Sequence, residues 1–134
     1  MNPPAPHTGV LTRLGVSSVH GVGVFAIHPI EAGTDVFPND RREIVWVDAA
    51  LVDALPEGSP ERLFYVDFGI RRGDRIGCPP SFELLGTGWY LNQPTPGMAA
   101  NVAAGEGYEM RALRDIAAGE ELTVDYATFS VRPV

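Results

Sequence analysis

Short apolar stretches alternate with turns rich in Gly, Pro and Asp along most of the chain, a pattern typical of β-rich domains. The clearest alternation lies near the C-terminus, where apolar residues 122, 124 and 126 share one face of a predicted strand and polar residues 123 and 125 the other. The fold class that we expect is therefore mainly β, with little helix. Strands are predicted over residues 11–16, 23–27, 44–47, 63–68, 88–91, 108–113 and 121–126.

One segment has a helical pattern. Residues 48–55 place Asp48 as an N-cap and are followed by Pro56, which limits the predicted helix to about two turns. Residues 1–9 are rich in proline and predict a flexible arm. The remainder, residues 10–134, is long enough for one hydrophobic core, so we expect a single domain.

The net charge of the chain limits the kinds of partner that it is expected to bind. A formal net charge of −7 argues against binding to a nucleic-acid phosphate backbone and favours a basic partner, although many intracellular proteins are acidic without such a partner. No apolar run reaches the roughly 18 residues of a membrane span. The first residues also lack the features of a secretory signal. We expect a cytoplasmic protein without a membrane or a direct nucleic-acid partner.

Metal and thiol chemistry are both disfavoured. The three histidines and the single cysteine, Cys78, lack the spacing of metal ligands, so no metal is expected. No histidine lies near Cys78 in the sequence, and a lone cysteine is usually a small buried apolar group. All ten basic residues are arginine, so an enzyme that modifies lysine could not act on its own side chains.

The segment 21–26, with the sequence GVGVFA, matches a dinucleotide-binding fingerprint. That fingerprint binds a pyrophosphate only where a helix follows the turn. Pro29 and Gly33 interrupt the place where this helix would run, so we reject a Rossmann-type site. The remaining interpretations are a two-glycine turn that lies close to a ligand and a plain hairpin or bulge.

Three segments in order resemble the motifs of SET-domain protein lysine methyltransferases. Residues 20–33 contain HGVGVFA and then IEAG, similar to the family's opening motif. Residues 89–93, WYLNQ, followed by Asn101 and Val102, resemble its aromatic-x-N-H-S-x-x-P-N motif. Residues 112–126, ALRDIAAGEELTVDY, are similar to its A-x-R-D-I-x-x-G-E-E-L-T-x-D-Y motif. Together these segments span most of the chain.

The resemblance implies a β-clip fold of several small sheets, in which the C-terminal segment passes under an earlier loop as a pseudoknot. It also implies transfer of a methyl group from S-adenosylmethionine to a lysine of a protein substrate, with S-adenosylhomocysteine as the product and no metal. A SET-like β-clip module that binds a peptide or the cofactor without turnover is the alternative. The implied protein partner presents an exposed lysine in a basic segment.

Site residues follow from the same resemblance. Tyr126 would be the catalytic tyrosine, and the substrate channel would be lined by Tyr65, Trp89, Val124 and Tyr126. Core packing is the alternative role for Tyr65 and Trp89. Phe129 would cover the adenine or line the channel, and a dimer partner that does this instead is the alternative. The residues expected at the cofactor are Gly21, Val22, Gly23, Val24, Phe25, Tyr90, Asn92, Gln93 and Phe129.

Three departures from the family pattern bear on activity. Gln93 replaces the family's His and Pro94 replaces its Ser, and residues 95–100 contain an insertion before Asn101. If the His side chain ties the pseudoknot to the tyrosine strand, Gln can supply that bond, because an amide both donates and accepts hydrogen bonds. No cysteine follows Tyr126 in residues 127–134, so we expect no zinc-binding tail, and a homodimer that completes the channel is a further possibility.

Overall fold

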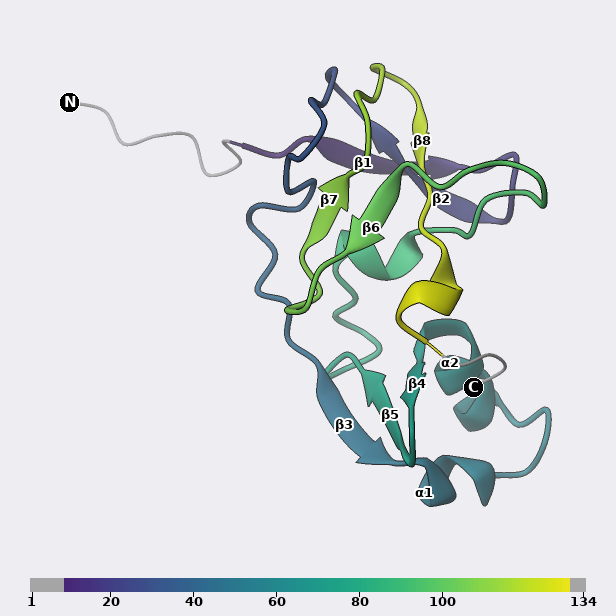
Figure 1. Cartoon of the computed structure of the whole chain (residues 1–134). Helices are drawn as coiled ribbons and strands as arrows, with labels where there is room; N and C mark the ends of the chain where they lie inside the picture. Colours follow the sequence, from purple (N-terminus) through teal and green to yellow (C-terminus); the bar gives the residue numbers. More distant parts are fainter. Residues whose placement is uncertain (1–8, 131–134) are drawn as a thin grey trace.

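The computed structural model describes residues 9–130 and shows two groups of elements, one above the other (Figure 1). The upper lobe contains an antiparallel sheet in the order β1-β2-β8 and the hairpin β6-β7. The bounds of these strands are β1 Thr12–Val16, β2 Val22–Ala26, β6 Val102–Ala104, β7 Met110–Ala112 and β8 Glu121–Leu122.

The lower lobe contains a second antiparallel sheet, in the order β3-β5-β4, and two short helices. Its helix α2 begins at Ser59, whose side chain accepts a hydrogen bond from the Arg62 N–H, with Pro60 in the first turn. The bounds are β3 Val45–Asp48, α1 Ala49–Asp53, α2 Pro60–Phe68, β4 Ile70–Arg72 and β5 Arg75–Cys78.

Two single-turn 3-10 helices lie where the lobes meet. The first, η1, spans Thr87–Tyr90, and the second, η2, spans Tyr126–Thr128 and lies between β8 and α2 (Figure 1). The Arg71 N–H of β4 donates a hydrogen bond to the Ser130 hydroxyl at 3.0 Å. This bond fixes the end of the described chain to the lower sheet.

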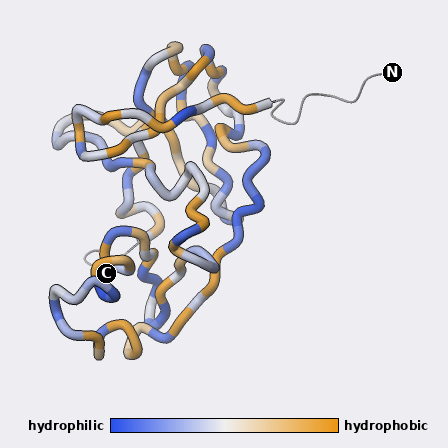
Figure 2. The backbone as a smooth tube through the Cα atoms, turned by 180° about the vertical axis from the view of Figure 1, so that it is seen from behind, coloured by the Kyte–Doolittle hydropathy of each residue, from blue (hydrophilic) through white to orange (hydrophobic). Residues whose placement is uncertain are grey.

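Each lobe has its own hydrophobic core. The larger core fills the upper lobe and includes Val24, Ile116 and Leu122, which are fully buried or nearly so. A smaller core of Ala49, Val52 and Ile76 lies in the lower lobe. The connection from the upper lobe to β3 is mostly hydrophilic and follows the outside of the molecule (Figure 2). The two cores are separate clusters of buried residues, and Tyr126 and Phe129 pack against the larger one.

The segment after β8 passes between two parts of an earlier loop. On one side, the Val124 N–H donates to the Asn92 carbonyl at 3.0 Å. On the other side, the N–H groups of Asn101 and Val102 donate to the Thr123 carbonyl at 3.2 and 3.0 Å. The loop between Asn92 and Asn101 therefore encloses the segment, which confirms the expected pseudoknot and the mainly β fold.

Five of the seven predicted strands overlap observed strands, whereas two apolar segments predicted as strands overlap helices. The predictions over 11–16, 23–27, 44–47, 108–113 and 121–126 overlap observed strands, and the predicted helix overlaps α1. The predicted strands 63–68 and 88–91 are wrong, because the first lies in α2 and the second overlaps η1. The proposed arm over residues 1–9 lies outside the described residues except for Gly9.

Candidate functional site

Tyr126 lies directly after the enclosed segment and is fixed at both ends of the residue. Its hydroxyl donates a hydrogen bond to the carbonyl of Leu91, which lies 35 residues earlier in the chain. Its backbone N–H donates to Oε1 of Gln93 at 3.2 Å. Gln93 thus makes a side-chain bond to the tyrosine segment, the bond that Gln was considered able to supply in place of the family's His. The orientation of Tyr126 is set by the loop that the segment passes through.

Asn92 holds the two-glycine turn. Its amide is buried, and its Nδ2 atom donates to the carbonyls of His20 at 2.9 Å and Val22 at 3.2 Å. Gly21 between them has a φ of +48°, in the left-handed region that favours glycine. No described atom lies within 4 Å of the position that a Cβ would take at Gly21, so this side of the turn is open. A ligand can approach the backbone there.

Glu121 holds the same turn through hydrogen bonds to Asn92 and Ser17. Its carboxylate accepts hydrogen bonds from the Asn92 amide at 3.0 Å and the Ser17 hydroxyl at 2.8 Å. A Cβ at Gly23 would collide with this carboxylate, so a larger residue there would force the Glu121 side chain away from Asn92. The turn is therefore held in one shape by side chains of two distant segments.

Glu120 supports the enclosed segment instead. It accepts hydrogen bonds from the Arg114 guanidinium, the Ala117 N–H at 3.1 Å and the Asn101 amide at 3.1 Å. The Arg114 guanidinium, with help from the other two donors, lowers the pKa of Glu120 to about 2. Asn101 is buried, and its Oδ1 accepts a bond from the Thr123 N–H at 2.8 Å. Asn101 thus reaches the pseudoknot despite the insertion before it.

A narrow cavity of about 90 Å³ lies beside Tyr126, between the two lobes. Its wall is mostly apolar and includes residues of β4, β7, α2 and the chain on both sides of η2. Acidic side chains and Arg42 also contribute to its lining. Among the apolar and aromatic lining residues are Phe37, Ile44, Phe68, Ile70, Trp89, Leu91, Tyr108, Met110, Val124, Tyr126 and Phe129.

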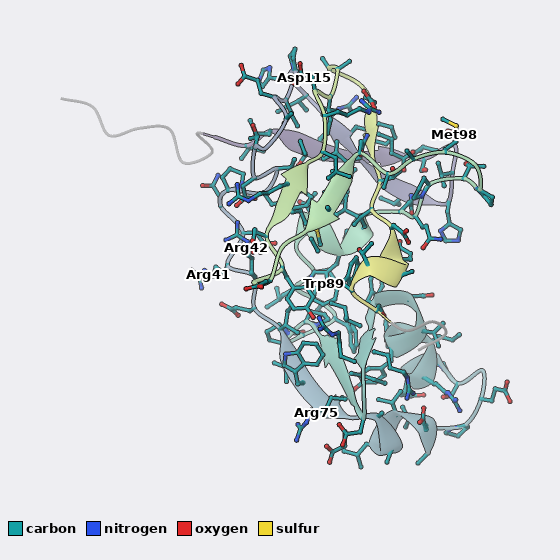
Figure 3. The ribbon with its side chains drawn as sticks, viewed as in Figure 1. Arg41, Arg42, Arg75, Trp89, Met98 and Asp115 are labelled. Atoms are coloured by element: carbon teal, nitrogen blue, oxygen red, sulfur yellow. The ribbon has the colours of Figure 1, made fainter. Side chains whose placement is uncertain are left out.

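Three of the four predicted channel residues line this cavity: Trp89, Val124 and Tyr126. Trp89 lies between the lobes, far from Met98 of the inserted loop (Figure 3). Tyr65 does not line this cavity; it packs against the small core of the lower lobe and edge-on against Phe82 at 5.2 Å, which is the packing role considered as its alternative. Tyr65 lies in α2, whose last two residues, Asp67 and Phe68, line the cavity instead.

Some of the residues predicted at the cofactor lie next to Asn92 or Tyr126, and the others pack against different parts of the protein. The structure brings the turn of residues 21–23 next to Asn92 and places Gln93 beside Tyr126. The Val24 side chain is fully buried in the core, so only its backbone could contact a ligand. Phe25 is half-buried and lies over Gly15, and the Tyr90 ring packs edge-on against Phe68 at 5.7 Å.

Phe129 is placed at the cavity. It lines the wall, and its ring packs edge-on against that of Tyr126, with 6.2 Å between the centroids. The position is compatible with the channel role considered for Phe129, and its contact with the cofactor stays a prediction.

Sequence reasoning missed several residues that shape the site. Glu120 and Glu121 lie inside the third motif, so their adjacent carboxylates were a usable sign. Phe37, Tyr108 and Met110 line the cavity from positions outside the quoted motifs, and nothing in the sequence marks them.

Other chemistries find no support among residues 9–130. The structure holds no group of three or more His, Cys, Asp or Glu side chains suited to a metal ion in this range. Burial raises the pKa of the Cys78 thiol, which donates a weak bond to the Val45 carbonyl at 3.5 Å, so the thiolate is disfavoured. No helix of the described chain is long and apolar enough to cross a membrane.

Comparisons with known proteins agree with this architecture. The sequence profile of the SET domain family matches residues 21–127, so the chain belongs to the SET domain family. The fold is similar to the crystal structure of a presumed histone methyltransferase from Plasmodium falciparum, with a TM-score of 0.53 and 20% sequence identity. The similarity covers 86% of this chain and 91% of that chain, and at this identity it shows the fold alone. Among curated proteins, none matches this sequence significantly.

Proposed function

We propose that this protein transfers a methyl group from S-adenosylmethionine to the side-chain amine of a lysine in another protein. SET domains are generally lysine methyltransferases, and this chain has the family's tyrosine at the wall of an apolar cavity. The observation that carries the proposal is the bond from the Tyr126 hydroxyl to the Leu91 carbonyl, because it fixes both groups beside the cavity.

The cofactor would be held by the turn of residues 21–23, by Asn92 and by the main chain at Gln93. The open side of Gly21 allows close approach to the backbone, and the Asn92 bonds hold the turn in shape. When bound, S-adenosylmethionine supplies an electrophilic methyl group. The residues present therefore fit this cofactor.

The cavity would prepare the lysine for reaction. The amine must be neutral, because its lone pair would form the new N–C bond while the bond between the methyl group and sulfur breaks, whereas a free lysine has a pKa of about 10.4. Apolar lining residues such as Val124 and Phe129 favour the neutral amine by desolvation and so lower its pKa. The Tyr126 hydroxyl and the Leu91 carbonyl would orient the amine. Aromatic rings at the wall tolerate the methylated ammonium through cation–π attraction.

The charge of the protein supports a basic substrate segment. The chain carries a net charge of −7, and Asp40, Glu43 and Asp67 are among the residues that line the cavity. Negative potential at an entrance attracts cations and raises the rate of encounter. We therefore propose that the target lysine lies among basic residues and that its capture weakens as salt is added.

A transfer assay with labelled S-adenosylmethionine and lysine-rich peptides tests the proposal. Because the chain contains no lysine, lysine methylation of the enzyme itself cannot contribute to the result. We expect label on peptide lysine with the wild type and none with Tyr126→Phe. Cofactor binding without transfer to any lysine would support the non-catalytic module instead.

A further inference from the structure

Tyr108 has a backbone conformation that a large side chain seldom adopts. Its φ is +62°, in the left-handed region, and it follows the turn residues 105–107 between β6 and β7. Its N–H donates to the Gly105 carbonyl at 3.0 Å, which keeps the turn closed. Strained residues of this kind persist where the surrounding structure holds them, and they are common at functional sites. Tyr108 lines the cavity beside Tyr126.

Contacts from the lower lobe hold the Tyr108 side chain in place. The β6-β7 turn points toward β3 (Figure 1). The Arg72 guanidinium of β4 donates a hydrogen bond to the Tyr108 hydroxyl at 2.9 Å. The Trp46 ring of β3 lies 6.2 Å from the Tyr108 ring, at a tilt of 50°. One residue of the upper lobe is thus anchored by two strands of the lower lobe.

The Tyr108 ring also contacts Phe129, which in turn contacts Tyr126, the predicted catalytic residue. The rings of Tyr108 and Phe129 meet edge-on, with 6.4 Å between their centroids and an interplanar angle of 89°. Phe129 in turn meets Tyr126 edge-on, at 6.2 Å and 79°. Edge-to-face pairs at this separation are favourable and directional. A continuous row of rings therefore runs from Trp46 through Tyr108 and Phe129 to Tyr126.

We propose that Tyr108 is a positioning residue for the transfer reaction, acting on Tyr126 through Phe129. Its left-handed backbone places the ring in the cavity wall, where it supports Phe129 and so limits the movement of the Tyr126 ring. The ring, rather than the hydroxyl, does this, and Arg72 only steadies it. The reaction itself rests on the proposed function, whereas the positioning can be measured without catalysis.

Kinetics of three variants test the effect on the reaction. In Tyr108→Ala we expect kcat/KM for a lysine peptide to fall about tenfold, mainly through kcat, while the Kd for S-adenosylmethionine stays within about twofold. Tyr108→Phe keeps the ring and should stay within about threefold of the wild type. Phe64→Ala serves as the matched control, because Phe64 stacks on Phe82 at 5.1 Å and does not line the cavity. Wild-type kcat/KM in Tyr108→Ala would overturn the proposal.

Nuclear magnetic resonance of protein with labelled tyrosine tests the positioning directly. The chain has four tyrosines, so the ring signals are few, and Tyr126→Phe identifies those of Tyr126. We expect the Tyr126 signals to shift or broaden in Tyr108→Ala but to stay in place in Tyr108→Phe and Phe64→Ala. Tyr108→Leu replaces Tyr108→Ala if the latter does not fold. Unchanged Tyr126 signals in the Ala or Leu variant would overturn the inference, even where the wild type transfers no methyl group.

Discussion

The Oε1 atom of Gln93 accepts a hydrogen bond from the backbone N–H of Tyr126 at 3.2 Å. Gln93 stands where the SET family pattern has a histidine, so the changed residue still links the enclosing loop to the tyrosine segment. An amide suffices for this link, because it needs only an acceptor at the right distance. The altered motif is therefore compatible with a fixed Tyr126.

Replacing Gln93 tests this link. In Gln93→Ala the Tyr126 N–H loses its side-chain acceptor, and we expect kcat to fall about three- to tenfold because Tyr126 becomes less well oriented. Gln93→Glu keeps an acceptor oxygen and should retain more activity. Steady-state kinetics with a lysine peptide measure both. Equal activity of Gln93→Ala and the wild type would show that the bond is dispensable.

Removal of the Tyr126 hydroxyl separates chemistry from cofactor binding. Tyr126→Phe loses the bond to Leu91 and the group proposed to orient the amine, so we expect transfer to fall at least about a hundredfold. The affinity for S-adenosylmethionine should change less than about twofold, because the cofactor turn is held by Asn92. Rapid turnover by this variant would refute the assigned role.

The two buried asparagines should differ in their effects. Asn92→Ala removes donors from the His20 and Val22 carbonyls, so we expect S-adenosylmethionine binding to weaken about tenfold or more. Calorimetric titration of this variant against the wild type measures the change. Unaltered affinity would place the cofactor elsewhere.

Asn101→Ala is the matched comparison within the pseudoknot. It leaves the buried Thr123 N–H without its side-chain acceptor, and we expect a loss of about 1–3 kcal/mol in the free energy of unfolding. Urea unfolding measures this loss. A variant as stable as the wild type would mean that the Asn101 side chain does not hold the enclosed segment.

We expect the free energy of unfolding to fall at low pH as Glu120 becomes protonated. Its pKa in the folded state is about 2, below the value of about 4.3 for an unfolded glutamate, so the unfolded state binds more protons between these values. The stabilising contribution is present above about pH 5 and is lost as the pH falls toward about 2. Glu120→Gln should therefore lose less stability than the wild type over that window. Urea unfolding at several pH values measures both proteins. An equal loss of stability in the wild type and Glu120→Gln would contradict this assignment.

Much of the fold could be predicted because its motifs and its alternation are local. The strand around Leu122 and Val124 is visible from its period of two, and the two-glycine turn is visible from Gly21 and Gly23. The pseudoknot cannot be inferred from alternation, since the hydrogen bond from the Val124 N–H to the Asn92 carbonyl joins distant segments. Only the resemblance to a family predicted it.

The lower lobe was harder to predict. Residues 63–68 look like a strand because they are apolar and aromatic, but the cap at Ser59 and the Pro60 that follows start a helix before them. That helix carries Tyr65 to the small core rather than to the cavity. The cavity wall also needs residues such as Tyr108, whose place depends on a left-handed backbone that no pattern marks.

Isothermal titration of the purified protein with S-adenosylmethionine and S-adenosylhomocysteine tests the central claim most directly. The proposal predicts binding of both ligands at one site per chain, with weaker binding in Asn92→Ala, because Asn92 holds the turn. No heat of binding at millimolar ligand would contradict a cofactor site in this chain, while the SET fold would stand.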